Sequence, residues 1–283
     1  MSRQRLSPKI TQWIAKGLIW AATILTVAVL LFIVIYTLSR GMPHVNWRLL
    51  STQPTDMGRS GGILPTIVGT TVLAILGVVV AAPFGVGTAV YLVEYTREGW
   101  LTRVIRFGVD ALAGIPSIVY GLFGFVFFVI TLGFGWSVAS GALTLAIMIL
   151  PTIVRTAEEA LRAVPDSYRE VSLSLGAHKW EMIATVALPA ALPGIVTGII
   201  LGIGRCVGET AAVILTAGSS LRMPTSLFSP ARTMSVHFYI LAREGISDDM
   251  AWATGAVLVV SILLVNVVIN WLVARLIRSR VAR

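Results

Sequence analysis

The sequence predicts an all-α, polytopic membrane protein with about six transmembrane helices, and three observations support this fold class. Hydrophobic residues make up 56% of the 283 positions, and charged residues make up only 12%. A soluble globular domain carries about 25% charged residues, roughly twice this share. Several uninterrupted apolar runs also exceed the roughly 20 residues that a helix needs to cross about 30 Å of hydrocarbon. A soluble fold is therefore excluded.

The first span is predicted at residues 17–38, after a basic N-terminal segment, 1–16. Its apolar run is too long for a signal peptide and lacks a small-residue cleavage site, so we expect it to stay in the membrane. An outer loop, 39–62, leads to a core, 63–274, and 275–283 form the C-terminal segment. The core is predicted to contain five spans, at about 63–94, 107–132, 138–157, 191–217 and 251–274.

Prolines indicate breaks in two of these spans. The second span is longer than a membrane requires, and Pro83, with Gly85 and Gly87 close behind, is expected to kink it near one face. Pro116 and Ser117 interrupt the third span. A broken span either exposes backbone groups to a transport path or forms a packing kink, and the sequence favours neither reading over the other.

The distribution of basic residues predicts the orientation. Segments assigned to the cytoplasm hold fifteen of the 22 lysines and arginines: Arg3, Arg5, Lys9, Lys16, Arg97, Arg103, Arg106, Arg155, Arg162, Arg169, Lys179, Arg275, Arg278, Arg280 and Arg283. Outer segments hold six: Arg40, Arg48, Arg59, Arg222, Arg232 and Arg243. Because Lys and Arg accumulate in cytoplasmic loops, both termini are expected in the cytoplasm. The same excess accounts for the net charge of +9 without nucleic-acid binding.

Several kinds of chemistry lack the residues that they need. The single cysteine, Cys206, lies in an apolar run, which excludes a disulfide framework and a cysteine metal site. A Walker A loop requires Gly before Lys, but the three lysines follow Pro8, Ala15 and His178. We therefore predict no catalytic residue, no metal, no cofactor and no ATP site, so that energy for any transport must come from another subunit.

The loop between the fourth and fifth spans, 158–190, is longer than a simple helix connection and is predicted to be structured. Pro165 suits the first turn of a helix, Glu170 favours its positive end, and Gly176 can adopt the left-handed conformation that ends it. A second helical stretch, 180–188, follows. Two short helices joined at Gly176 would form a knob that fits a partner's groove. The alternative is an amphipathic hairpin that touches only lipid.

The spacing in this loop resembles the EAA motif of permease subunits in ABC importers. Glu170 is followed by Gly176 six positions later and, after nine more residues, by VALP at 186–189. Val171 and Ser172 replace the two alanines of the motif, and valine replaces its isoleucine. These exchanges are small or apolar, so docking is still expected.

The resemblance extends over most of the chain from about residue 63. The stretches GIPSIVYGLF at 114–123 and GRCVGETAAV at 204–213 look like phosphate-specific permease subunits of the PstA type. This resemblance implies a MetI-like fold in the bacterial inner membrane and a role in phosphate import. It implies that a PstB-like ATPase dimer receives the loop, a PstC-like sister permease completes the pore and a PstS-like periplasmic protein delivers phosphate. The expected ATPase-coupling residues are Pro165, Tyr168, Glu170, Gly176, Leu188 and Pro189.

Two charged residues are predicted inside the fifth span. Arg205 and Glu209 are four positions apart, which on a helix places them on one face. Either charge alone would cost at least about 2.5 to 3.5 kcal/mol in hydrocarbon, so both must face protein, water or each other. They form either a mutually neutralising pair that packs against other helices or part of a substrate path.

Glycines favour the substrate path. Gly202 and Gly208 flank Arg205, and Gly194, Gly198 and Gly202 repeat at every fourth position. Small residues at this spacing usually allow close helix packing, which is the expected role of Gly194 and Gly198. Beside Arg205 they also leave room for an anion, which the planar guanidinium can bind in a bidentate manner. The resemblance covers the same stretch, and the expected path residues are Arg205, Gly208, Glu209 and Thr210.

Two further features are interpreted less specifically. Asp110 lies one helical turn beyond Arg106 and is expected to form an ion pair at the cytoplasmic boundary. The outer segment 233–243 is typical of an interfacial helix, and contact with the binding protein is the alternative. Three apolar residues share one face of it: Met234, Phe238 and Leu241.

Other function classes fit the sequence less well. An intramembrane enzyme would need a histidine at depth, but His44, His178 and His237 all lie in loops. A membrane sensor or scaffold would explain the cytoplasmic knob but not the buried Arg205. Among transporters, a permease for another oxyanion, such as sulfate or molybdate, is the alternative to a phosphate permease.

Overall fold

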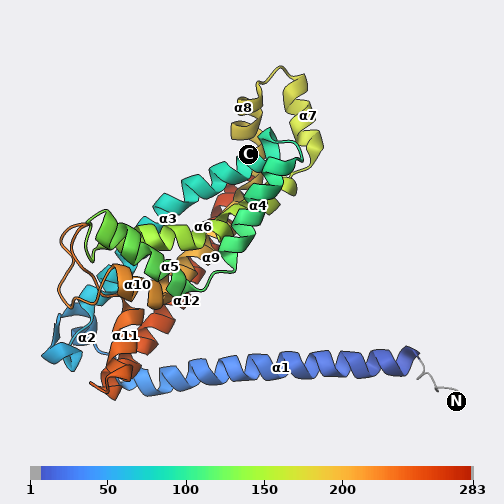
Figure 1. The fold of residues 1–283 in the computed structure, drawn as a ribbon. Coiled ribbons are helices and arrows are strands. Elements are labelled where there is room, and N and C mark those ends of the chain that lie inside the picture. The colour runs from blue at the N-terminus through green and yellow to red at the C-terminus, as the bar shows by residue number, and fades with distance from the viewer. Residues whose placement is uncertain (1–7, 282–283) are drawn as a thin grey trace, which may run out of the picture.

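A computed structural model describes residues 8–281 and confirms an all-helical membrane fold (Figure 1). Five helical segments in this range are long and apolar enough to cross a membrane. They contain α1 (Pro8–Gly41), α3 (Leu64–Val90), α6 (Val138–Arg162), α9 (Leu188–Gly208) and α12 (Asp248–Val281). The number rises to six if one bent pair counts as a single span: α4 (Trp100–Ala113) is followed by α5 (Ser117–Gly124) with the π-helical turn η4 (Phe125–Thr131), and the two halves are bent by 100°.

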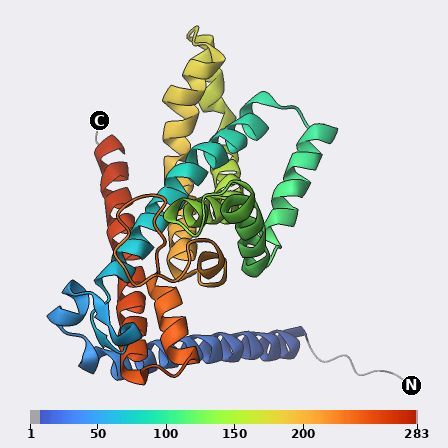
Figure 2. The same cartoon turned by 60° about the vertical axis from the view of Figure 1, so that its left-hand side comes forward.

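The centre of the bundle is α6, which packs between α3 and α9 (Figure 2). The most apolar window of α6 is 67% buried, the largest share among the five candidate spans. Gly77 and Gly85 of α3 bring that helix close to Leu145 and Ile153 of α6. The core at this junction includes Leu73, Leu145, Met148, Ile149 and Ile153. The side chains of α9 are therefore held by a helix that packs against the most buried span of the molecule.

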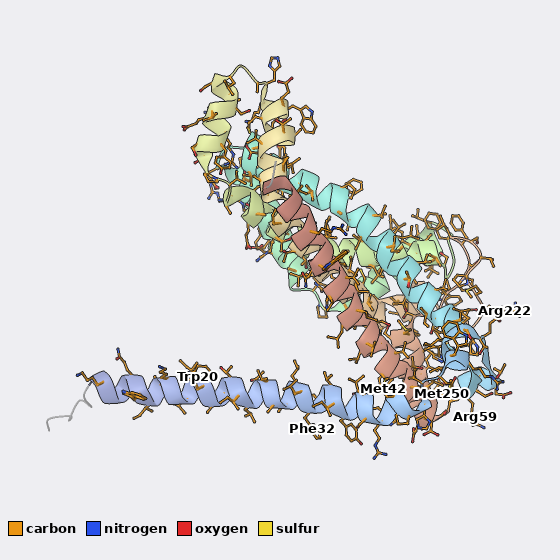
Figure 3. The ribbon with its side chains drawn as sticks, turned by 180° about the vertical axis from the view of Figure 1, so that it is seen from behind. Trp20, Phe32, Met42, Arg59, Arg222 and Met250 are labelled. Carbon is orange, nitrogen blue, oxygen red and sulfur yellow. The ribbon has the colours of Figure 1, made fainter. Side chains whose placement is uncertain are left out.

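The first helix, α1, extends away from this bundle (Figure 1). Its most apolar window is 0% buried. The C-terminal end of α1 meets α12. There Gly41 lies against the carbonyl group of Trp252, and the contact leaves no space for a side chain at Gly41. In Figure 3, Met42 and Met250 lie at this junction, whereas Trp20 and Phe32 lie on the free part of α1.

The end of the bundle predicted to be outside carries short elements. They are η1 (Met42–His44), α2 (Trp47–Ser51), η2 (Asp56–Gly58), α10 (Ala211–Thr216) and α11 (Met234–Arg243). Strands β1 (Pro54–Thr55) and β2 (Ser60–Gly61) pair antiparallel, with Pro54 opposite Gly61. α11 exists as predicted, but Met234 and Leu241 are buried in protein. The expectation of an interfacial helix with these residues on a lipid-facing surface was therefore wrong.

Two predicted spans differ in detail from the structure. α3 continues unbroken through Pro83, and its irregularity lies further on, in the π-helical turn η3 (Tyr91–Tyr95). The predicted fifth span, 191–217, is two helices, because α9 ends at Gly208 and α10 begins at Ala211. Three residues of the charge count, Arg3, Arg5 and Arg283, lie outside the described residues.

Candidate substrate path and coupling site

One face of α9 packs tightly against α6. Gly194 lies against Ala160, and Gly198 lies so close to Thr156 that any side chain there would overlap it. This contact confirms the packing role expected of the two glycines. It also fixes the rotation of α9 about its own axis, and so determines where the remaining faces point.

Arg205, in the last turn of α9, lies on a side that the chain leaves open. Leu201, four residues earlier and thus on the same face, is 54% exposed. Nothing lies within 4 Å of the position that a Cβ atom would take at Gly204 or Gly208. Arg205 itself is half-buried. The surface of α9 around Arg205 is therefore open.

Arg205 and Glu209 do not share a helix face, so the predicted arrangement of this pair was wrong. α9 ends at Gly208, and Glu209 has an extended backbone with φ −74° and ψ 129°. One reason is a competing partner, because Glu209 Oε1 accepts the Ala212 N–H at 3.2 Å, at the start of α10. The ion pairs between described residues do not include Arg205 or Glu209. Mutual neutralisation therefore does not account for the charge of Arg205.

The linker after Gly208 is held in place from both sides. Ser235 Oγ, in α11, donates to the Glu209 carbonyl at 2.7 Å. The Thr210 carbonyl accepts the Ile214 N–H at 3.0 Å and so begins α10. Gly208, Glu209 and Thr210 thus form a fixed turn directly after Arg205. All four predicted path residues lie in this short stretch, as their positions in the sequence require, and their role in a path stays a prediction.

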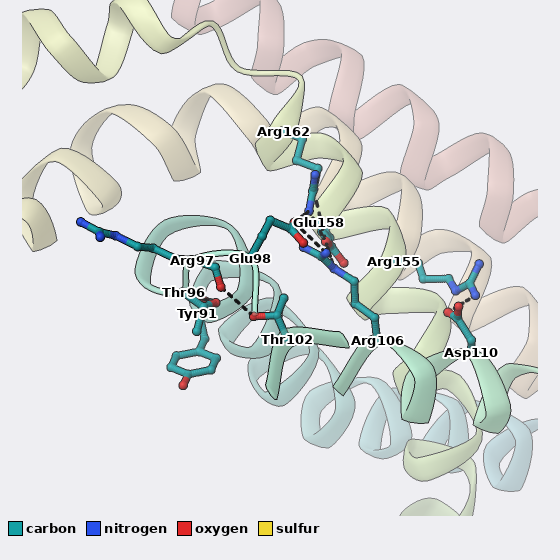
Figure 4. Close-up of polar contacts among 10 residues, drawn as sticks. All are labelled: Tyr91, Thr96, Arg97, Glu98, Thr102, Arg106, Asp110, Arg155, Glu158 and Arg162. Atoms are coloured by element: carbon teal, nitrogen blue, oxygen red, sulfur yellow. Dashed lines mark hydrogen bonds and ion pairs between the residues drawn. The ribbon is translucent and has the colours of Figure 1, made fainter. Parts of the chain in front are cut away.

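The predicted pairing of Asp110 with Arg106 was also wrong. Asp110 pairs with Arg155 of α6 (Figure 4). Arg106 Nε instead donates to Glu158 Oε1 at 2.9 Å, and its Nη1 donates to Glu98 Oε1 at 2.9 Å. The reason is that α4 lies beside the charged end of α6, which offers partners to both residues. α4 is thus bound to α6 through ion pairs.

Glu158 is the centre of this group of charges. Its side chain is largely buried, and Arg162 Nη2 adds a second arginine contact at 2.9 Å. The hydrogen bond from Arg106, together with its charge, lowers the pKa of Glu98 below its ordinary value. A cavity of about 320 Å³ lies between α4 and α6. The sequence offered one signal for this group, since Arg155, Glu158 and Arg162 recur at helical spacing.

The predicted interruption of the third span is present. α4 ends at Ala113 and α5 begins at Ser117, directly after Pro116. The hydroxyl of Tyr120 donates to the Leu112 carbonyl at 2.6 Å across the break. The same carbonyl accepts the Ile115 N–H at 3.1 Å, so a backbone donor and a side-chain donor both hold it at the break. The Tyr120 hydrogen bond thus links α5 to the end of α4 and helps to fix the angle between them.

The predicted knob is a helical hairpin, α7 (Asp166–Ser174) and α8 (Lys179–Met182), at the end of the bundle opposite α2 (Figure 1). Tyr168 and Glu170 are exposed on α7. Several apolar side chains of the hairpin are exposed as well: Val171, Leu173, Leu175 and Trp180. Exposed apolar groups among charges are typical of a surface that binds another protein.

Gly176 ends α7 in the predicted left-handed conformation, with φ +89°. Its N–H donates to the Leu173 carbonyl at 3.0 Å, and the Ala177 N–H donates to the Ser172 carbonyl at 3.3 Å. Nothing lies within 4 Å of a Cβ atom placed on Gly176. Its requirement for glycine is therefore conformational and does not come from crowding. Pro165 immediately precedes α7, one position before the predicted first turn.

The second arm of the hairpin continues into the membrane helix. α8, the π-helical turn η5 (Ile183–Ala187) and α9 form one helical segment from Lys179 to Gly208. Leu188 and Pro189 are half-buried and begin α9, so Pro189 does not stop the helix. The wider π-helical turn lies where the proline ring would otherwise meet the carbonyl four residues earlier. A movement of α8 would therefore be transmitted directly to the helix that carries Arg205.

Sequence reasoning missed a buried ion pair at the base of the hairpin. Arg169 of α7 contacts Glu94 in η3, with Nη2 and Oε1 2.9 Å apart. The charge distribution identifies Arg169 only as one of the basic residues predicted in the cytoplasm. Its neighbour Asp166 is a local acidic partner, but nothing in the sequence points to a residue 75 positions away.

A second buried polar contact lies at the opposite end of the bundle. His237 Nδ1 is 3.2 Å from Nη1 of Arg232. Among the described residues, no group pairs with His237 Nε2. Gly58, with φ +97°, covers the ring closely. Burial, assisted by the charge of Arg232, lowers the pKa of His237 to about 4.

Comparison with known proteins reveals one matching family. The model of the binding-protein-dependent transport system inner membrane component matches residues 81–281. The probable ABC transporter permease protein YqgI of Bacillus subtilis is 33% identical over 283 residues, which cover 94% of this chain and 96% of that protein. The phosphate transport system permease protein PstA of Yersinia pestis is 33% identical over 251 residues, or 87% of this chain and 84% of that protein.

The phosphate transport system permease protein PstA 1 of Mycobacterium tuberculosis (strain H37Rv) is 44% identical over 169 residues, 60% of this chain and 54% of that protein. A bacterial alginate ABC transporter has a chain of similar fold, with a TM-score of 0.69, 16% identity and coverage of 96% and 98%. A chain of the MetNI methionine ABC transporter, in an inward-facing conformation, gives a TM-score of 0.60 at 22% identity, with coverage of 76% and 94%.

Proposed function

The chain belongs to the family of binding-protein-dependent transport system inner membrane components, and we propose that it is a permease subunit of an ATP-driven phosphate importer. The relatives named as phosphate transport permeases support phosphate as the cargo. The observation that carries the proposal is the open side of α9 around Arg205. This residue is half-buried and unpaired among the described residues, with open space beside it.

Arg205 would make the path favourable for an anion. A fixed positive charge lowers the electrostatic cost of bringing a negative ion to membrane depth. The planar guanidinium offers paired N–H donors that match two phosphate oxygens. Gly204 and Gly208 leave the space that such an ion needs. Each of these properties acts on any oxyanion of similar size. The site therefore favours oxyanions as a class, and other groups must supply much of the discrimination between phosphate and sulfate.

A sister permease would complete this path. The side of α9 that carries Arg205 and Leu201 is not covered by the other helices of the chain. A hydrated anion cannot travel along a protein face that contacts lipid, because hydrocarbon does not solvate charge. A second, homologous subunit placed against this side would enclose the path between the two proteins. The open side of α9 is thus the expected interface.

The hairpin would receive the driving force from a cytoplasmic ATPase dimer. Its helices stand out from the bundle and expose apolar side chains that fit a groove (Figure 1). Since α8 continues into α9, closure of the ATPase would move the helix that carries Arg205. The subunit then alternates between two states while both of its termini stay in the cytoplasm. A periplasmic phosphate-binding protein would load it from the opposite end.

The test is transport by a complex reconstituted in lipid vesicles from this chain and its proposed partners. We expect ATP-dependent uptake of labelled phosphate, and we expect Arg205→Gln to abolish it without preventing assembly. Arg222→Gln is the matched control, because Arg222 lies exposed at the outer end (Figure 3). Near-normal uptake by an assembled Arg205→Gln complex would contradict the role of Arg205. Preferred uptake of sulfate or molybdate by the unmodified complex would contradict phosphate as the cargo.

A further inference from the structure

Arg169 connects three elements at the base of the hairpin. Its Nε and Nη2 donate to Oε1 of Glu94, in the turn η3 that continues α3, at 3.0 and 2.9 Å. Nη2 also donates at 2.8 Å to the carbonyl of Leu161, in the last turn of α6, and Nη1 donates at 2.7 Å to the carbonyl of Val164, two residues beyond α6. Nη1 further contacts Asp166 at 3.1 Å. A single guanidinium thus joins α7 to α3 and to α6.

The burial of this ion pair indicates a geometric role. The side chains of Arg169 and Glu94 are only 14% and 5% exposed. Removing two charges from water costs about as much as their attraction returns, so apolar side chains of similar size would stabilise the site equally well. Apolar side chains could not, however, bond carbonyl groups at the end of α6. The guanidinium does so in a fixed plane, which defines direction as well as distance.

The two arms of the hairpin are anchored differently. The second arm leads into Met182 and Ile183, which are buried in an apolar cluster with Ala89 and Leu161. In α7, by contrast, no apolar residue is buried. Apolar packing therefore does not define the angle of the first arm. The contacts of Arg169 are the ones that can hold α7 at a definite angle to the membrane helices.

We propose that Arg169 is a positioning residue that, through Glu94, transmits movement of the hairpin to α3 and α6 and so couples ATP hydrolysis to transport. This inference rests on the proposed function. α3 and α6 form the packed centre of the bundle, and α9 lies against both. A rotation of α7 would reach the substrate path through α3 and α6, in parallel with the continuous α8 to α9 helix.

The experiment compares neutral variants in the reconstituted complex. Arg169→Gln leaves Glu94 as a buried, unpaired charge and is expected to impair assembly. Arg169→Gln combined with Glu94→Gln removes both charges and is expected to restore assembly. If Arg169 positions the hairpin, the double variant still hydrolyses ATP, but phosphate moved per ATP falls between about twofold and about thirtyfold. If Arg169 only stabilises the fold, the double variant that assembles normally also moves a normal amount of phosphate per ATP.

Two further variants define the specificity of this effect. Arg97→Gln is the matched control, since Arg97 (Figure 4) is an exposed arginine three positions after Glu94, and it should leave the ratio unchanged. Arg169→Lys keeps the charge but lacks the planar set of donors that reaches Glu94 and the carbonyl groups together. We expect it to assemble normally and to couple poorly. Full coupling by Arg169→Lys would overturn the positioning role.

A structural measurement separates this inference from the proposed function. Spin labels at Ser174 and Tyr91, both exposed, report the distance between α7 and η3 in a Cys206→Ser background. The distance distribution should broaden in the double variant and stay narrow with Arg97→Gln. An unchanged distribution overturns the inference even if phosphate transport is established. Failure of the unmodified complex to transport phosphate while the distribution broadens would instead refute only the proposed cargo.

Discussion

The carboxylate of Glu209 illustrates how one residue can serve both structure and selectivity. Its Oε1 accepts an N–H at the start of α10. Phosphate at neutral pH retains a proton and can donate a hydrogen bond to a carboxylate, whereas sulfate cannot. A buried acceptor that meets an anion without a donor imposes a penalty of a few kcal/mol. We therefore predict that Glu209→Gln loses discrimination against sulfate by about tenfold or more while phosphate passage changes less.

The measurement requires reconstituted complexes whose cargo is supplied without depending on the binding protein's own preference. Labelled phosphate and labelled sulfate are compared in the same vesicles. Glu244→Gln, an exposed carboxylate at the outer end, serves as the control. An equal fall in both fluxes would show that Glu209 only supports the turn between α9 and α10.

His237 gives the outer end a dependence on pH. Burial lowers its pKa from 6.5 to about 4, so the folded state disfavours the protonated ring. The unfolded chain binds the proton more readily than the folded chain does. The stabilising contribution of neutral His237 is therefore fully present above about pH 6.5, and it is lost as the pH falls toward 4. The full loss is at most about 3 kcal/mol. We predict that the apparent melting temperature in lipid nanodiscs falls over this pH range.

Replacing His237 by Gln should flatten this pH dependence, since the amide oxygen can still accept from Arg232 without titrating. His44→Gln is the control, because His44 is partly exposed next to Asp249. A pH profile that is identical in the unmodified protein and the His237→Gln variant would exclude His237 as its source.

Single residues differ in how well the sequence predicts them. Arg205 could be found from the sequence, because an arginine in a long apolar run is costly and rare. The position of Glu209 could not be found, because helical spacing holds only while the helix continues, and the helix ends at Gly208. The partner of Asp110 was missed for a different reason: the nearest basic residue in the sequence was not the nearest one in space.

At the level of elements, the hairpin depends on the conformation of Gly176. With φ +89° and open space around it, a β-branched replacement would cost about 1 kcal/mol or more through the backbone alone. We predict that Gly176→Val redirects α8 and reduces both phosphate uptake and ATPase association. Gly176→Asn is the matched control, since asparagine tolerates the left-handed region.

Both Gly176 variants must first be shown to reach the membrane at normal levels. Uptake that is unimpaired by valine would remove the coupling role of the turn. Equal losses with valine and asparagine would point to the side chain itself and not to the backbone conformation.

The elements themselves were largely predictable. Apolar length identified the membrane helices, and Pro165 with Gly176 marked the ends of α7. The breaks were harder, since Pro83 left α3 intact while Pro116 separated α4 from α5. A proline removes one hydrogen bond in either case, and the packing around it decides whether the helix continues.

For the whole molecule, α1 is the candidate membrane span that its own chain covers least. Its most apolar window is 0% buried, and it meets α12 near Gly41. We predict that α1 packs across a neighbouring subunit in the assembled complex. A cysteine in place of Leu25, in a Cys206→Ser background, should cross-link to the sister permease in membranes. A cysteine in place of Val79, exposed on α3, is the comparison, and cross-linking of Leu25→Cys only within its own chain would contradict the prediction.

Contacts that unite the whole molecule were beyond sequence reasoning. Arg169 and Glu94 are 75 positions apart, and Arg106 and Glu158 are 52 positions apart. Charge counts indicated on which side of the membrane these residues lie, but one sequence does not show which of several nearby charges pair. Such pairing depends on the crossing of helices, which in turn depends on small residues such as Gly85 and Gly198.

The attachment of α4 to α6 by ion pairs has a consequence for behaviour in salt. Trp100, Val104 and Phe107 of α4 are exposed, so charge attraction supplies much of its contact with α6. The Debye length shrinks from about 8 Å at physiological ionic strength to about 3 Å at 1 M salt. Amide hydrogen exchange in α4 should therefore accelerate in concentrated salt while exchange in the apolar core of α6 stays slow. Equal protection of α4 at both salt concentrations would mean that lipid, and not charge, holds this helix in place.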